Sequence, residues 1–311
     1  MRREGSPWHG LGVVFMKELS DHLSSARMRV LEWLVVLTAM AALYGAIQQV
    51  RDNTAEDPFL FLRLFTVARE PLPSFVAFLG FLVPLMAIGL GFDAVNGEHA
   101  RRTLSRILAQ PIYRDALLFG KFLAGLATLT VSLVCLWLLV IGLGLFLLGI
   151  PPGGEEMARS LVFLLATIAY AGVWLALAML FSIVFRSAAT AALVSLGLWL
   201  FLTVIWPALA QFVASAILPD DEATLAVGTQ MLSRLSPSTL YGETVLAILN
   251  PQIPTLGPIY ISQLQGRVMG APLQFWDSVI LAWPQIVGLI AGTIVLFVIG
   301  YVVFQRQEVR A

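Results

Sequence analysis

Long apolar runs dominate the sequence, and short polar segments separate them. A helix that crosses the hydrocarbon core of a bilayer needs about 20 apolar residues, with a range of roughly 17–25. A charge at the membrane centre costs at least about 2.5 kcal/mol, so spans are expected to exclude charges. Six runs satisfy both conditions and contain no Asp, Glu, Lys or Arg: Trp33–Val50, Phe75–Phe92, Phe122–Ile150, Leu161–Phe185, Ala188–Leu218 and Val279–Phe304. The pattern predicts an all-α, polytopic membrane protein forming one domain over residues 1–311.

The segment before the first run has a different, helical pattern. Ser6-Pro7 is typical of a helix start, with Ser as N-cap and Pro in the first turn. Apolar residues then recur at helical spacing while most charges lie off that stripe, which predicts an amphipathic elbow helix over residues 6–30 on the cytoplasmic membrane face. The stripe consists of Leu11, Phe15, Leu19, Leu23, Ala26 and Val30.

Two longer polar segments interrupt the spans. Residues 93–121 form a loop rich in basic residues, with a short apolar face at Leu104, Ile107 and Leu108. Residues 219–278 are expected to be extracytoplasmic, with helices near Glu222–Leu235 and Thr239–Leu249. This second segment is large enough for a small cap and too small for an independent catalytic domain.

Composition supports the membrane assignment. The chain is 59% hydrophobic and 12% charged, whereas soluble domains contain about 25% charged residues. A single cysteine, Cys135, lies inside an apolar run and is expected to be a buried packing residue, so neither a disulfide nor a cysteine-based metal site is predicted. The first apolar run begins near Val30, which is too far from Met1 for a cleavable signal peptide.

The distribution of basic residues predicts the orientation. Six spans place both termini on one side, and that side holds thirteen Lys and Arg residues against six on the other. The positive-inside rule therefore predicts that both termini are cytoplasmic, in the plasma (cytoplasmic) membrane.

Residues that would carry catalysis are missing from the apolar runs. The three histidines, His9, His22 and His99, are widely spaced and show no metal-ligand pattern. Gly120-Lys121 lacks the following Ser or Thr and the upstream Gly of a phosphate-binding loop. We therefore expect no catalytic, metal or cofactor site in this chain and no nucleic-acid partner. If the protein moves a substrate uphill, the energy must come from a partner that docks on the cytoplasmic side, most plausibly at the 93–121 loop. The alternative is that this loop merely contacts lipid headgroups.

This loop resembles that of a known family. Glu98, Thr103-Leu104, Pro111-Ile-Tyr-Arg114 and Gly120-Lys121 are similar to the motif of ABC type-2 exporter permeases, although Arg102 stands where that family usually has Gly. Ser236-Pro237-Ser238 and Leu249-Asn250-Pro251 resemble the branch that contains the permeases for nitrous-oxide-reductase maturation.

The resemblance implies a function and a set of coupling residues. The chain would be the permease subunit of an ATP-driven exporter, paired with a second permease copy as a homodimer, while a cytosolic ATPase subunit binds ATP and Mg. A coupling helix in the loop would enter a groove of that ATPase, and the elbow helix would pack beside it. The residues implied in coupling are Glu98, Arg101, Arg102, Thr103, Leu104, Arg106, Leu108, Pro111, Arg114, Gly120 and Lys121.

Two other classes stay open at this stage. One is a membrane anchor or scaffold for a maturation or signalling complex that transports nothing. The other is an intramembrane enzyme, which the missing charged and His residues of the spans disfavour. The transported substrate does not follow from the sequence.

Overall fold

The chain is described by a computed structural model that covers residues 8, 10–52, 59–100, 113–149, 151–219, 221–253, 255–256 and 272–307. Within these residues all regular secondary structure is helical, apart from one isolated β-bridge between Arg69 and Leu72. The helices are α1 (Leu11–Ser24), α2 (Ala26–Asp52), α3 (Arg63–Thr66), α4 (Phe75–Gly91), α5 (Asn96–Ala100), α7 (Arg114–Leu148), α8 (Gly154–Val184), α9 (Ala188–Leu200), the π-helix η1 (Phe201–Ile205), α10 (Trp206–Ile217), α11 (Glu222–Ser233), α12 (Pro237–Leu249) and α14 (Phe275–Arg306).

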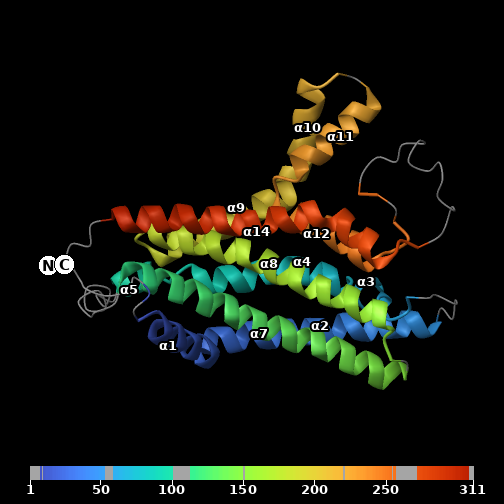
Figure 1. The fold of residues 1–311 in the computed structure, drawn as a ribbon, viewed down its shortest axis with the longest axis horizontal. Coiled ribbons are helices and arrows are strands. Elements are labelled where there is room, and N and C mark those ends of the chain that lie inside the picture. Colours follow the sequence, from blue (N-terminus) through green and yellow to red (C-terminus); the bar gives the residue numbers. More distant parts are fainter. Residues whose placement is uncertain are drawn as a thin grey trace.

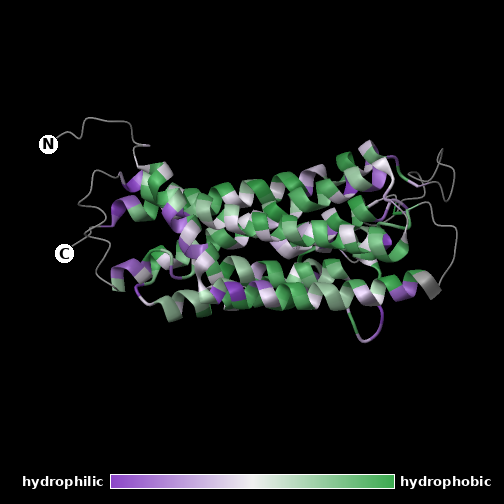
Figure 2. Ribbon diagram, turned by 90° about the horizontal axis from the view of Figure 1, so that it is seen from below, coloured by the Kyte–Doolittle hydropathy of each residue, from purple (hydrophilic) through white to green (hydrophobic). Residues whose placement is uncertain are grey.

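Six helices are long and apolar enough to span a bilayer, which confirms the predicted fold class. Five of them and the first part of the fifth spanning helix, α9, run side by side in one elongated bundle (Figure 1). Apolar residues cover most of its length, and hydrophilic residues gather mainly towards its ends (Figure 2). The longest, α7, has 35 residues and is therefore ~52 Å long, which exceeds the ~30 Å hydrocarbon core. Its charged first turns must extend beyond the hydrocarbon core.

The predicted elbow helix is wrong in its bounds. Helix α1 begins at Leu11, after Gly10 in the left-handed region (φ 90°), and the predicted start at Ser6 lies outside the described residues. It ends at Ser24 because Ser25 is extended, with ψ 139°. The following residues already belong to the first spanning helix, so residues 6–30 are not one helix.

The helix that contains the first predicted span starts before that span. The span begins at Trp33 in the sequence pattern, whereas α2 is continuous from Ala26. Glu32 therefore lies on the helix that contains the first predicted span, directly before the charge-free run. Helical hydrogen bonding continues through the glutamate because its backbone is as suited to a helix as that of its neighbours.

Helix α8 is the centre of the bundle. Tyr170 and Trp174 on α8 are completely buried. Small residues let its neighbours come close: a Cβ on Gly91 of α4 would lie 2.8 Å from the Cβ of Ala178, and one on Gly172 would lie 3.2 Å from Thr293 Oγ1 of α14. In lipid such close packing replaces the hydrophobic driving force that helices have in water.

The fifth spanning helix is bent. The π-helical turn η1 interrupts it between α9 and α10, and π-turns commonly mark such irregularities. Beyond this turn α10 and α11 project away from the bundle (Figure 1). Thr203 Oγ1 lies 2.8 Å from Ser238 Oγ, and Trp206 Nε1 donates to the Leu232 carbonyl at 2.9 Å, so polar contacts connect the bend to α11 and α12.

A buried arginine joins the helices at the bundle end opposite α1. Arg159 of α8 has no exposed side-chain surface. Its guanidinium donates to Glu155 at 2.8 Å, to Ser278 Oγ at 2.9 Å and to the carbonyls of Ile248 and Leu273 at 3.0 and 2.6 Å. Arginine suits this role because its rigid fork presents five donors. The four acceptors come from α8, α12, α14 and the segment before α14, so this one side chain fixes their arrangement.

We predict that Arg159→Ala lowers the apparent thermal unfolding midpoint in detergent, measured by tryptophan fluorescence. Truncation leaves two buried carbonyls without donors, and breaking such a buried charged network costs about 3–5 kcal/mol. Arg234→Ala is the matched control because Arg234 pairs with Glu243 at 2.8 Å but is 32% exposed. An equal shift in both variants would show that Arg159 is not a special connection.

Candidate functional site at the charged end of the bundle

Several helix ends meet at one end of the bundle. Helix α1, the short α5, the start of α7 and the last turns of α14 lie there (Figure 1). The loop predicted for coupling leaves the bundle after α5 and returns at α7. This end therefore presents the residues that flank the loop.

Lys121 is the central charge of this end. It lies on α7 and is only 5% exposed. Its Nζ is 2.7 Å from Glu98 Oε1 on α5 and 2.9 Å from Glu18 Oε1 on α1. A buried ammonium is expensive unless it is paired, and two carboxylates satisfy it here. Through Lys121 the two described parts of the predicted 93–121 loop, which belong to α5 and α7, are bound to each other and to α1.

The contact between α1 and α7 depends on a glycine. A Cβ on Gly120 would lie 2.7 Å from Cγ1 of Val14 and 3.4 Å from the Leu11 carbonyl oxygen. Because glycine has no Cβ, the two helices approach closely enough for Glu18 to reach Lys121. Trp8 packs edge-on against Phe119 with ring centroids 5.1 Å apart and covers the same junction.

A second ion pair joins the spans next to the loop. Arg27 at the start of α2 lies 3.0 Å from Asp93 and stacks over Phe92 at 5.1 Å from its centroid. The turn that follows is held by α8: Ser182 Oγ accepts from the backbone N–H groups of Val95 and Asn96 at 2.9 and 3.2 Å. The backbone that leads into α5 is therefore anchored to the central helix.

The first turn of α7 is tied to the last turns of α14. Arg114 donates to the carbonyl of Gln307 at 3.1 Å, and the Asp115 carboxylate accepts from Tyr301 Oη at 3.0 Å and from the Gln305 amide. Gln307 in turn donates to the Ile183 carbonyl at 2.8 Å. The return of the loop is thus linked to both α14 and α8.

Charge pairing and burial also shift the pKa values of ionisable side chains on α1. Burial by itself would raise the pKa of Glu18, but the neighbouring Lys121 and Lys17 together hold that pKa below its ordinary value. Burial lowers the pKa of Lys17, yet its bonds to Glu18 and Asp21 outweigh burial and leave that pKa raised. Burial lowers the pKa of His22. At neutral pH the Glu18 carboxyl is therefore ionised.

The structure brings together some of the residues implied in coupling. Glu98, Gly120 and Lys121 meet at α1, and Arg114 lies in the neighbouring cluster with α14. The remaining ones lie outside the described residues: Arg101, Arg102, Thr103, Leu104, Arg106, Leu108 and Pro111.

Sequence reasoning missed other members of this site. Glu18 was assigned to the polar face of the elbow helix, whereas it is 8% exposed and paired. Asp93, Asn96 and Ser182 were not singled out. Position 18 follows Val14 by one helical turn, so the spacing could have shown that both face the same helix. Nothing in one sequence shows that this neighbour is Lys121.

We predict that the stabilising effect of Glu18 depends on pH. Because its folded-state pKa is lowered, its contribution is complete above the unfolded pKa of about 4.5 and is lost as pH falls through the lower folded value. Glu18→Gln should lower the apparent unfolding midpoint at pH 7, consistent with about 1.5–3 kcal/mol for a hydrogen bond to a charged group. The difference from wild type should shrink below pH ~4.5. Asp21→Asn, which removes an exposed pair with Lys17, should change little at either pH.

Comparison with known proteins agrees with this architecture. The sequence model described as "ABC-2 family transporter protein" matches residues 13–309. A protein named "Probable ABC transporter permease protein NosY" from Pseudomonas aeruginosa is 30% identical over 242 residues, which is 76% of this chain and 76% of that protein. A protein of the same name from Stutzerimonas stutzeri is 28% identical over 184 residues, or 59% of this chain and 63% of that one. The family match spans all six membrane helices and the charged end, and the chain therefore belongs to the ABC-2 family of transporter proteins.

Proposed function

We propose that this chain, a multi-pass permease subunit of an ABC transporter, works as an exporter whose charged end receives a separate ATPase subunit. The carrying observation is the pairing of Lys121 with both Glu98 and Glu18. These contacts join α1 to both sides of the segment that resembles a coupling loop. A movement imposed on that loop would therefore move α1, α5 and α7 together.

The physical requirement for coupling is a rigid connection. Salt bridges at the surface contribute little, but buried pairs fix geometry because breaking them leaves a charge without a partner. Arg114 and the Ser182 contacts extend the connection to α14 and α8. The ATPase would bind ATP and Mg, and this chain would supply the docking surface and, with a second permease copy, the path through the membrane.

The direction and sidedness are part of the proposal. The excess of Lys and Arg on the side of the charged end supports a cytoplasmic location for both termini. The resemblance to exporter permeases in the loop supports outward transport. The relatives named NosY support a permease role for this chain as well.

The loop residues Leu104 and Arg106 provide the first test. We predict that Leu104→Asp with Arg106→Asp abolishes stimulation of the partner ATPase in reconstituted complexes. At a protein interface, placing like charges next to each other costs several kcal/mol. Because every 1.4 kcal/mol is a factor of ten in an equilibrium constant, ATPase stimulation should fall at least about tenfold. The measurement is ATP turnover of the ATPase with wild-type or variant permease in the same vesicles.

Ala226→Asp provides the matched control, because it adds a negative charge at an exposed position of α11, away from the charged end. Its ATPase stimulation should equal that of wild type. Undiminished stimulation in the loop variant would contradict docking at this loop. If stimulation depends on the loop but no substrate crosses the membrane, the chain acts instead as an ATP-responsive scaffold.

A further inference from the structure

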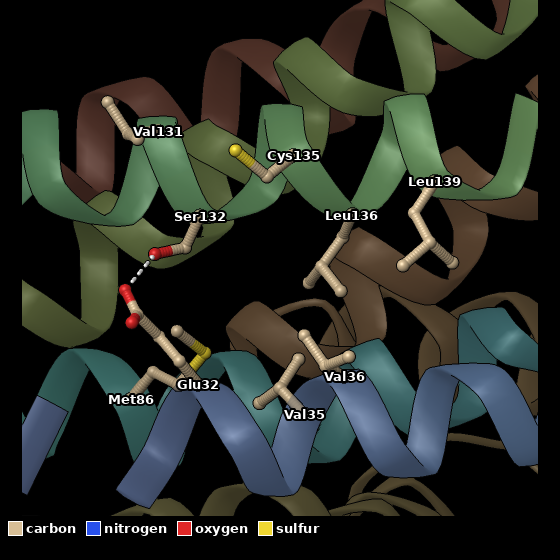
Figure 3. Close-up of a pocket in the computed structure, with 9 residues that line it drawn as sticks. All are labelled: Glu32, Val35, Val36, Met86, Val131, Ser132, Cys135, Leu136 and Leu139. Atoms are coloured by element: carbon tan, nitrogen blue, oxygen red, sulfur yellow. Dashed lines mark hydrogen bonds between the residues drawn. The ribbon is translucent and has the colours of Figure 1, made fainter. Parts of the chain in front are cut away.

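Glu32 carries a carboxyl group on a spanning helix, and the coupling contacts do not use it. It lies on α2, inside a candidate membrane span. Ser132 Oγ of α7 donates to Glu32 Oε1 at 3.2 Å (Figure 3). An ionisable residue within a span indicates function by default, because its desolvation must be compensated.

The carboxyl group borders a cavity of about 230 Å³. Figure 3 shows it between α2 and α7, with Met86 of α4 beside it. The oxygen atoms of Glu32 and Ser132 are its polar side-chain groups, and the rest of the lining is aliphatic or sulfur: Val35, Val36, Met86, Val131, Cys135, Leu136 and Leu139. A single carboxyl group in an otherwise apolar cavity does not fit a site for a hard metal ion, because such an ion needs several oxygen ligands.

The cavity lies deeper than the charged rim. Arg27, which pairs with Asp93, precedes Glu32 by five positions on the same helix. At 1.5 Å per residue this is ~7.5 Å along α2. The Glu32 carboxyl is thus about one and a half turns further along α2 than the rim ion pair.

Glu32 has no ionic partner among the residues that the structure describes. In the part of the chain that the structure describes, no Lys, Arg or His nitrogen lies within 4.0 Å of its carboxylate. Arg29, one turn earlier on α2, is exposed and does not reach it.

We propose that this cavity binds a small amphipathic organic cation, with its ammonium group on Glu32 and its apolar part against the valines and leucines. The pairing neutralises two charges that would each be costly alone in an apolar environment. The volume is below the 300–1,000 Å³ of drug-sized sites, so the ligand has about the size of one aromatic ring with a short ammonium arm. This site is independent of the ATPase contact and of the direction of transport.

Cys135 provides a reporter for this site, because it lines the cavity, is exposed and is the single cysteine of the sequence. The probe is benzyltrimethylammonium, and its neutral isostere neopentylbenzene has the same shape without charge. The rate of Cys135 alkylation by N-ethylmaleimide is followed by intact mass in phosphatidylglycerol nanodiscs, because this headgroup carries no amine. At ten times its dissociation constant the cation should slow alkylation about tenfold, because only the free fraction reacts.

Two variants separate charge from cavity. Glu32→Gln keeps the shape and should weaken protection by at least about tenfold, the value of one charge-assisted contact. Val36→Phe keeps the carboxylate, fills the cavity and should also abolish protection. Both variants are first compared with wild type in gel-filtration profile and unfolding midpoint, and either one suffices if the other does not fold.

Three results would overturn the proposal. Wild-type alkylation could be unaffected by benzyltrimethylammonium, neopentylbenzene could protect as well as the cation, or Glu32→Gln could be protected as well as wild type. A fourth arm replaces phosphatidylglycerol with phosphatidylethanolamine, whose headgroup carries an ammonium group. If this lipid alone slows alkylation and removes the effect of the cation, the site holds a lipid amine, and the assignment to a small soluble cation is wrong.

Discussion

A lysine ammonium that is almost removed from water can persist only beside compensating negative charge. Lys121 meets this constraint with carboxylates from two different helices, Glu18 at 2.9 Å and Glu98 at 2.7 Å. The close crossing at Gly120 is what allows α1 to bring its carboxylate there. One buried charge therefore determines the position of α1 and holds α5 and α7 together at the two sides of the proposed coupling loop.

Helix α8 connects this arrangement to the rest of the bundle. Near one end its Ser182 holds the backbone that leads into α5. Near the other, its Arg159 binds the carbonyls of Ile248 and Leu273. Between these points α8 is packed closely by α4 and α14. A helix anchored by polar contacts at both ends is suited to transmit displacement as a rigid body, whereas apolar packing alone would let it slide.

Hydropathy predicted the six spanning helices because the bilayer imposes a length and excludes charge. The helices extend beyond the charge-free runs that this rule selects. Glu32 and Lys121 were left outside the spans, although both lie within the spanning helices that the structure shows. Ser132, the partner of Glu32, is 100 positions away in the sequence, and Glu98, the partner of Lys121, lies on the other side of a loop. A single sequence does not reveal which residues pair over such separations. The motif resemblance identified Glu98, Gly120 and Lys121 as a set, and the structure supplies the physical reason they occur together. Glu18 could not be found this way because its importance comes only from the packing of α1.

In the proposed coupling, the Glu98–Lys121 pair is part of the connection between the ATPase and the membrane helices. A double-mutant cycle tests this role of the pair most directly. Lys121→Met, Glu98→Gln and the double variant are compared by ATPase stimulation in reconstituted complexes, each with its unfolding midpoint measured in parallel. If the pair acts as a unit, the double variant loses little more than either single variant, with an interaction energy of about 0.5–3 kcal/mol. Strictly additive losses, or full stimulation without the pair, would contradict the account.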